Sequence, residues 1–145
     1  MAITIEKVPT EAAAFGFIRR IRYKVFVEGQ DVPEAEEFDT YETTATHFLA
    51  RWNEQPAGAA RWRRTEDGFK LERFAVLSEF RLKGLGSALV QRVLDDLPTD
   101  TAALIYLHAQ FPAVPLYEKF GFRKVGSPFQ ECNIWHFRME KPAAV

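Results

Sequence analysis

Alternating and periodic hydrophobic positions divide the chain into strands and helices. In residues 2–8, Ile3 and Ile5 alternate with polar side chains, which predicts a first strand. Residues 10–27 repeat apolar positions at helical spacing and carry arginines mostly off the apolar side, which predicts an amphipathic helix. The acidic segment 28–42 contains proline and glycine and shows neither period, so we expect a long loop there.

The middle of the chain has the pattern of an antiparallel meander followed by a helix. Three strand-like runs, at 47–52, 58–64 and 69–77, are separated by the short polar connections NEQPA and EDG. The next periodic segment, 84–96, gathers its leucines on one face and stops before Pro98, which predicts an amphipathic helix.

The remaining pattern predicts a parallel strand and a short helix. Residues 103–109 (ALIYLHA) are apolar almost throughout, as is typical of a buried parallel strand, and the preceding helix would make the crossover to it. A short helix at 113–120 ends at Gly121, and 133–140 predicts the last strand. We therefore expect an α/β fold, strictly α+β: one domain over residues 1–145 with a mixed, mostly antiparallel sheet flanked by helices.

Composition narrows the class of protein. Apolar residues make up 47% of the 145 and charged residues 27%, which is an ordinary globular balance. The net charge is −1 and RWRR is a single short basic run, so we expect no nucleic-acid partner. No apolar run approaches the roughly 20 residues of a membrane span. The start, MAITIEKVPTEA, lacks the pattern of a secretory signal, so we expect a cytoplasmic protein without a membrane partner.

Cysteine usage excludes two further classes of site. Cys132 is the only cysteine, so the chain has no intrachain disulfide and no cysteine cluster for zinc. We expect Cys132 to be a small buried side chain, and we expect no metal site.

The stretch RLKGLGSALVQRVLDDL, residues 81–97, places two basic residues and two glycines before a helix. The free N–H groups and the positive dipole end of such a helix attract an anion, and glycines leave them unobstructed. Alternatively, Gly84 and Gly86 only allow a close turn against the sheet, with Arg81 and Lys83 solvated. The stretch lacks the third glycine of GxGxxG, and no GK[ST] follows, which argues against loops for dinucleotides and nucleoside triphosphates.

Two motifs, in this order, resemble the GNAT superfamily of acyl-CoA-dependent N-acyltransferases. Arg81-x-x-Gly84-x-Gly86 matches its [RQ]-x-x-G-x-[GA] signature, and LYEKFGF at 116–122 matches the end of its next helix. The terminal parts of the chain look like the small ElaA-like (YjcF-like) branch. The resemblance implies a sheet splayed at its central parallel pair, with acetyl-CoA (coenzyme A) as cosubstrate.

The resemblance assigns coenzyme A to the loop and to the strand before it. In the family, the pyrophosphate binds successive backbone N–H groups of the loop, and the pantetheine arm lies like an extra strand beside the sheet. Gln110 stands where family members often carry an asparagine that contacts the cofactor. The expected cofactor-binding residues are Phe74, Ala75, Val76, Arg81, Leu82, Lys83, Gly84, Leu85, Gly86, Ser87 and Gln110.

The chemistry that the resemblance implies needs an acid and a base. Tyr117, in LYEKF, matches the family's general acid, because a phenol still carries its proton at neutral pH. Several family members use a glutamate as base, where this chain has Lys70. Glu72 lies two residues further on and, by the strand period of two, on the same side as Lys70 and Phe74, so it is our first candidate. The further candidates are His108, Glu131 and His136.

Two functions of different kinds stay open. The first is an N-acyltransferase that moves an acetyl group from acetyl-CoA to a primary amine of a small molecule or protein, by direct attack in a ternary complex. The second is a non-catalytic acyl-CoA-binding module that has lost the base; Lys70 favours it, whereas Tyr117 favours the enzyme. The sequence does not identify the amine, although the acidic segment 28–42 favours a cationic one. Exposed terminal strands leave a homodimer open.

Overall fold

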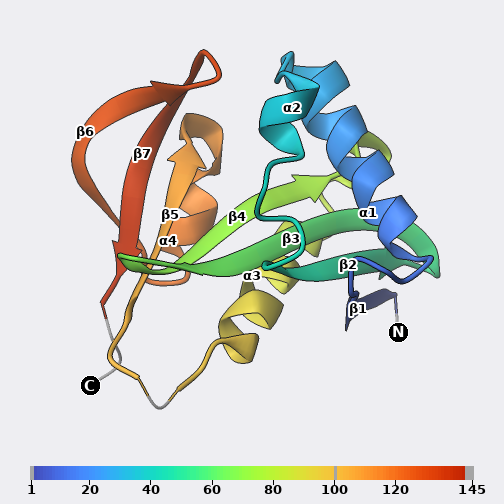
Figure 1. The fold of residues 1–145 in the computed structure, drawn as a ribbon, viewed down its shortest axis with the longest axis horizontal. Helices are drawn as coiled ribbons and strands as arrows, with labels where there is room; N and C mark the ends of the chain where they lie inside the picture. The colour runs from blue at the N-terminus through green and yellow to red at the C-terminus, as the bar shows by residue number, and fades with distance from the viewer. Residues whose placement is uncertain (1, 100, 143–145) are drawn as a thin grey trace.

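The computed structural model describes residues 2–99 and 101–142 and contains one seven-stranded sheet with helices on both faces (Figure 1). The order of its strands is β1-β2-β3-β4-β5-β7-β6. Their bounds are β1 (Ile3–Lys7), β2 (Thr46–Trp52), β3 (Gln55–Thr65), β4 (Gly68–Val76), β5 (Leu104–Gln110), β6 (Arg123–Glu131) and β7 (Ile134–Lys141). Neighbouring strands are antiparallel except β4 and β5, which are parallel. The prediction of an α+β fold with a mixed, mostly antiparallel sheet is confirmed.

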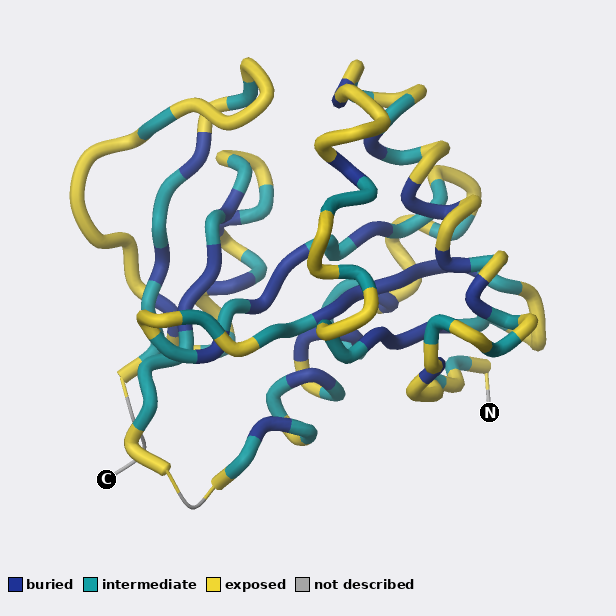
Figure 2. The backbone as a smooth tube through the Cα atoms, viewed as in Figure 1, coloured by how far each residue is buried: buried dark blue, intermediate teal, exposed yellow. Residues whose placement is uncertain are grey.

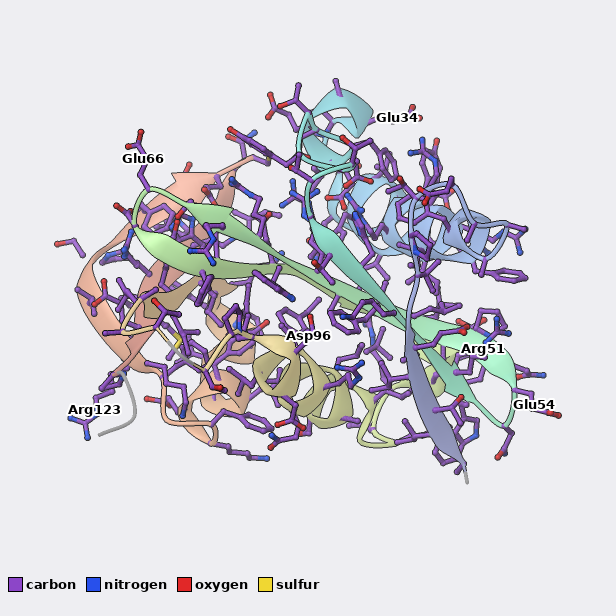
Figure 3. All side chains as sticks on the ribbon, turned by 60° about the horizontal axis from the view of Figure 1, so that its bottom comes forward. Glu34, Arg51, Glu54, Glu66, Asp96 and Arg123 are labelled. Carbon is purple, nitrogen blue, oxygen red and sulfur yellow. The ribbon has the colours of Figure 1, made fainter. Side chains whose placement is uncertain are left out.

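Helices cover the two faces of the sheet separately. They are α1 (Phe15–Arg22), the π-helical η1 (Tyr23–Glu28), α2 (Glu34–Glu37), α3 (Leu85–Asp96) and α4 (Val114–Glu118), with short 3₁₀ turns η2 (Ser78–Phe80) and η3 (Phe111–Ala113). Leu49 of β2 packs with α1, whereas its neighbours Phe48 and Ala50 pack on the face that carries α3 and α4. Glu34 on α2 and Asp96 on α3 accordingly lie on opposite sides of the sheet (Figure 3). No helix within residues 2–99 and 101–142 has the length and apolar character needed to cross a membrane.

Two segments near the N-terminus differ from the sequence prediction. The first helix begins at Phe15 rather than at residue 10 and continues as η1 to Glu28. The segment 28–42 is not a plain loop, because α2 forms within it after Pro33. Proline is well tolerated just before a helix, where its fixed φ suits the first turn and its missing N–H costs nothing.

Strand β6 was missed by the sequence prediction. Almost its whole length is exposed (Figure 2), since it forms the edge of the sheet beside β7. An edge strand that buries little has no need for alternating apolar residues, so the pattern does not reveal it. Gly126 and Pro128 also interrupt its pairing between Val125 and Phe129.

A β-bulge interrupts β4 where it runs beside β3. Ala75 pairs with Ala59. The next pair joins Glu72 to Arg61, so two residues of β4 lie opposite one residue of β3. Within the bulge, Arg73 has a φ of 62°, a left-handed conformation that non-glycine residues adopt infrequently.

The bulge changes which side chains of β4 share a face. Leu71 packs on the α3 face before the bulge, and Phe74 packs on the same face after it. Glu72 follows Leu71 and points to the opposite face, where it meets Arg61. The expectation that Glu72 and Phe74 share a side is therefore wrong, because the extra residue in the bulge shifts the alternation of side chains between the two faces by one position.

The parallel strands β4 and β5 separate partway along their length. Residues 68–71 pair with residues 104–107, and the pairing stops there. Glu72 and His108 are the first residues beyond the last pair, and we call this point the fork. The fork confirms that the sheet is splayed at its central parallel pair.

Candidate active site

A cleft of about 790 Å³ opens at the fork and has walls on both faces of the sheet. Its walls come from β3, β4, β5, η1, α2, η3, α4 and the hairpin of β6 and β7. The predicted site residues in its lining are Glu72, Phe74, Ala75, Val76, Arg81, Gln110 and Tyr117, together with the further base candidates His108, Glu131 and His136. Residues 82–87 lie outside this lining, in the loop that follows Arg81 and the start of α3.

The loop before α3 presents a row of unpaired backbone N–H groups. Among the described residues, none of the N–H groups of 82–87 donates a hydrogen bond; the first that does is that of Ala88, to the Gly84 carbonyl at 3.1 Å. Gly84 has a φ of 86° as the cap of α3. A Cβ on Gly86 would lie 3.5 Å from Cδ2 of Leu116 on α4. Free N–H groups at the positive end of a helix form a site that suits a phosphate.

Two cationic side chains, of Arg81 and Lys83, lie at this loop and contact other parts of the chain. The Arg81 Nε donates to the Val76 carbonyl at 3.2 Å, which holds the side chain against β4. The Lys83 ammonium lies 4.9 Å from the ring centroid of Trp52. Both side chains belong to exposed residues, so they add charge near the loop while the backbone offers the directed donors.

The free edge of β4 lies beside this loop. After the fork, Ala75 and Val76 pair with β3 on one side, and no strand pairs with residues 73–76 on the β5 side in the described chain. An exposed strand edge of this kind accepts an extended chain through backbone hydrogen bonds.

Tyr117 lies in α4 on the same face of the sheet as the loop. It is 7% exposed, and its ring packs edge-on against Phe74, with centroids 5.8 Å apart, and against Phe122. Burial raises the pKa of Tyr117 above its usual value, so the phenol keeps its proton at neutral pH. Its hydroxyl bonds no residue in the described chain and borders the cleft, whereas buried Tyr106 bonds Thr65, as expected of a core residue.

Glu72 is held by three cations. Its Oε1 accepts hydrogen bonds from Nε of Arg61 at 3.0 Å and Nε of Arg63 at 2.7 Å. Lys70 Nζ lies 3.4 Å from its Oε2. Burial alone would raise the pKa of Glu72, but the charges of Arg61 and the other cations outweigh it and lower the pKa. A carboxylate with a lowered pKa binds a proton weakly, which disfavours a role as base.

His108 stands across the fork from Glu72 and has a carboxylate partner. Its Nδ1 lies 3.1 Å from Oε2 of Glu131. This hydrogen bond lowers the pKa of Glu131, which therefore accepts the Nδ1 proton as a carboxylate. In the neutral tautomer that donates from Nδ1 to Glu131, Nε2 of His108 carries the lone pair that can accept a proton. His136 instead directs its Nδ1 to the Ile134 carbonyl at 2.7 Å.

The side chain of Gln110 is hydrogen-bonded to that of another glutamine. The side-chain amides of Gln110 and Gln30 exchange two hydrogen bonds, of 2.9 and 3.2 Å, between the end of β5 and the segment after η1. A cofactor contact through the Gln110 side chain would therefore have to compete with Gln30, and that assignment stays a prediction.

Three carboxylates of the acidic segment pair with buried arginines. Glu37 and Glu42 pair with Arg22 at 2.8 and 2.9 Å, and Asp39 pairs with Arg61 at 2.7 Å. Arg22 and Arg61 are 1% and 0% exposed, so they need these partners to offset the loss of water. The pairing neutralises these three carboxylates, whereas Glu36 of the same segment lines the cleft without an ion pair in the described chain, so the cationic acceptor stays a prediction.

Cys132 is exposed and borders the cleft, which contradicts the expectation of a buried side chain. It lies in the turn between β6 and β7, where Cys132 and Asn133 have φ values of 49° and 63°. A two-residue hairpin turn with positive φ at both positions points its side chains outward.

Sequence reasoning missed two cationic residues of the cleft, Arg63 and Arg73. Arg63 belongs to RWRR, which looks like one basic run, although strand alternation sends Arg61 and Arg63 to the cleft face and Arg64 to the other. The alternation of side chains along this strand was the signal that could have identified Arg63 as a cleft residue. Arg73 left no signal, because its place depends on the bulge.

Comparison with known proteins finds a matching family model and two similar bacterial proteins. A family model for an acetyltransferase (GNAT) domain matches residues 10–143. The uncharacterized N-acetyltransferase YjcF of Bacillus subtilis (strain 168) is 37% identical over 123 residues, which cover 83% of this chain and 87% of that protein. The uncharacterized protein YyaT of the same organism is 33% identical over 142 residues, which cover 96% of this chain and 95% of that protein.

Solved structures share the fold at low sequence identity. An acyl-CoA N-acyltransferase from Pseudomonas aeruginosa superimposes with a TM-score of 0.81 at 24% identity, covering 96% of this chain and 97% of that one. Escherichia coli ElaA gives 0.83 at 23% identity and covers 95% and 99%. A GNAT family acetyltransferase from Elizabethkingia anophelis with acetyl-CoA bound gives 0.68 at 19% identity and covers 96% and 95%.

Proposed function

Because the chain belongs to the acetyltransferase (GNAT) family, we propose that it transfers an acetyl group from acetyl-CoA to a primary amine by direct attack in a ternary complex. One observation carries this proposal. The row of unpaired N–H groups before α3 lies on the same face as Tyr117, beside a cleft that opens through the fork to the α2 face. A cosubstrate on the first face and an amine on the second would meet at the fork.

The residues around the loop fit a coenzyme A ligand. The N–H groups of 82–87 would bind the pyrophosphate, and Gly84 and Gly86 leave them without a covering side chain. The free edge of β4 at 73–76 would hold the pantetheine arm through backbone hydrogen bonds. Acetyl-CoA supplies the acyl group, activated as a thioester.

The transfer moves one proton off the amine and one proton onto sulfur. As the C–N bond forms and the C–S bond breaks, Nε2 of His108 accepts the proton that the amine nitrogen loses, and Glu131 holds the ring in the required tautomer. Tyr117 donates its phenolic proton to the departing sulfur. The tyrosinate then regains a proton from water, which its raised pKa favours.

The wild-type protein should release free thiol from acetyl-CoA when primary amines are added, because only acyl transfer or hydrolysis frees the thiol. Thiol titration over a panel of amines measures the rate, and mass spectrometry identifies the N-acetyl product. Tertiary amines of similar size are the control, since they cannot form an amide. Acetyl-CoA binding in calorimetry without thiol release for any amine would instead support the non-catalytic binding module.

Replacing each candidate base in turn shows whether Glu72 or His108 accepts the proton of the amine. His108→Gln should lower kcat/KM at neutral pH by about 10²-fold, the lower end of the general-base range, because water in the open cleft can take the proton in its place. The loss should shrink toward pH 10, where amines are already neutral. Glu72→Gln should keep the shape of the pH–rate profile.

His136→Gln is the matched control for this prediction, since His136 faces the same carboxylate but bonds a backbone carbonyl. If Glu72→Gln shows the pH-dependent loss and His108→Gln does not, the base is Glu72, as the sequence first indicated.

A further inference from the structure

Two cations stand side by side on the α2 face of the cleft. Lys70 of β4 and Arg63 of β3 are direct cross-strand partners, and both line the cleft. Like charges in directly opposed positions of an antiparallel pair destabilise it. Among the described residues, only the carboxylate of Glu72 lies within ion-pair distance of both.

Glu72 does not balance these charges, because it is also bonded to Arg61. The connected ion-pair network contains five cations and four carboxylates, which leaves an excess of one positive charge. Its cations are Arg22, Arg61, Arg63, Lys70 and Arg73, and its carboxylates are Glu37, Asp39, Glu42 and Glu72. Arg22 and Arg61 are fully buried, so the cations of the network that can meet a ligand are Arg63, Lys70 and Arg73, which line the cleft together with Glu36 and Glu131.

Lys70 and Arg63 keep unused hydrogen-bond donors. In the described chain, Arg63 donates only through Nε, and its guanidinium lies over the Tyr41 ring, 3.8 Å from the centroid, which fixes its plane. The Lys70 ammonium makes one ion pair, at 3.4 Å. Both side chains are only 15% exposed, so an anion that reaches them is attracted more strongly than it would be in bulk water.

We propose that the amine acceptor carries a carboxylate, which Lys70 and Arg63 bind while the amine lies at the fork. This inference rests on the proposed acyl transfer. The excess of one charge matches a carboxylate rather than a doubly charged phosphate. A planar guanidinium with two free nitrogens also matches the two oxygens of a carboxylate.

The spacing of the two sites limits the length of the acceptor. Lys70 precedes Glu72 at the fork by two residues, about 6.6 Å along a strand. The amine must reach His108 on the other arm of the fork while the carboxylate reaches Lys70. An α-amino acid carries both groups on one carbon, which leaves its amine less reach than that of an ω-amino acid. An ω-amino acid with a longer carbon chain fits.

The test compares ω-amino acids of increasing chain length with their own carboxamides, by thiol release from acetyl-CoA. Each pair has the same amine and the same length and differs in one negative charge. Wild-type kcat/KM should favour the carboxylate by about 10–100-fold, the effect expected of a hydrogen-bonded charge pair, with the maximum at chains longer than glycine. Aminoalkyl phosphates form a third arm, and a preference for them over the carboxylates would overturn the proposal.

Variants of Lys70 test whether the preference for a carboxylate depends on this side chain. Lys70→Met removes the charge at nearly constant length, and the ratio of carboxylate to carboxamide kcat/KM should fall toward one. Lys70→Arg should retain most of the ratio. Arg64→Gln is the control, because Arg64 neighbours Arg63 but is exposed, outside the cleft lining and over the Phe69 ring; its ratio should equal that of the wild type.

Two results would overturn the inference alone: equal kcat/KM within every pair of wild-type substrates, or an unchanged ratio in Lys70→Met. Failure of the proposed function looks different, since no amine would then release thiol, whether charged or not. That result would overturn both.

Discussion

Replacing Tyr117 with phenylalanine should lower kcat with acetyl-CoA by about 10²–10⁴-fold, the usual contribution of a general acid. The change removes the proton donor and keeps the ring that packs on Phe74 and Phe122. No hydrogen-bond partner in the described chain loses its bond, so thermal stability and acetyl-CoA affinity should hardly change. Steady-state thiol release, a thermal melt and calorimetry measure the three quantities.

The matched control is Tyr106→Phe, which removes a hydroxyl from another buried tyrosine, outside the cleft lining. It should cost some stability, because Thr65 loses a partner, and leave kcat near the wild-type value. An acyl donor with a more acidic thiol should partly rescue Tyr117→Phe, because its thiolate departs without a proton. The loss in kcat is smaller if product release limits the rate. Full wild-type turnover by Tyr117→Phe would assign the proton to water or another donor.

Elements with an apolar period could be predicted from the sequence, whereas the exposed elements β6 and α2, which lack one, could not. Strand β5 lies between two strands and shows a continuous apolar run, while α3 packs one face on the sheet and shows a helical period. Edge strand β6 buries few side chains, so its sequence shows no alternation of apolar and polar residues. Helix α2 is held by Arg22 and Arg73, whose bonds to it cross 15 or more positions of sequence.

The candidate site likewise contains residues that the sequence could predict and residues that it could not. The loop at 82–87 and Tyr117 are local features of contiguous motifs, so the sequence points to them. The setting of His108 depends on Glu131, 23 residues away, and that of Glu72 depends on Arg61 and on the bulge. Ion pairs between distant segments have no periodic signature, and a single inserted residue reverses the face of every side chain after it.

The two faces of the sheet have different chemistry on either side of the fork. The α3 face carries a row of backbone donors, an exposed strand edge and a protonated phenol. The α2 face carries polar and charged side chains, including His108 with its partner Glu131 and the neighbouring cations Lys70 and Arg63. The separation follows from the alternation of β5, where apolar Leu107 and Ala109 face α3 and His108 faces the other side.

The backbone donors of the loop lead to the second large effect. Gly86→Val should weaken acetyl-CoA binding by on the order of 10²–10⁴-fold, since blocking two hydrogen bonds to a charged group removes about 1.5–3 kcal/mol for each. A Cβ at Gly86 makes only ordinary contact with Leu116, at 3.5 Å, so the fold tolerates the first carbon. Because the Cα–Cβ bond of a helical residue tilts toward the helix N-terminus, we expect the two methyl groups of valine to hinder access to the N–H groups. Calorimetry with acetyl-CoA measures the affinity.

Gly16→Val is the matched control, because Gly16 is the second residue of α1 as Gly86 is the second residue of α3, and a Cβ there meets nothing within 4 Å. Both variants carry the same cost of a β-branched residue in a first helical turn, so a difference between their affinities comes from the loop alone. Arg81→Ala should weaken binding less than Gly86→Val, since Arg81 is exposed and already bonds the Val76 carbonyl. If folded Gly86→Val binds acetyl-CoA as tightly as Gly16→Val does, the N–H groups of 82–87 do not hold the pyrophosphate, and the glycines serve only the turn.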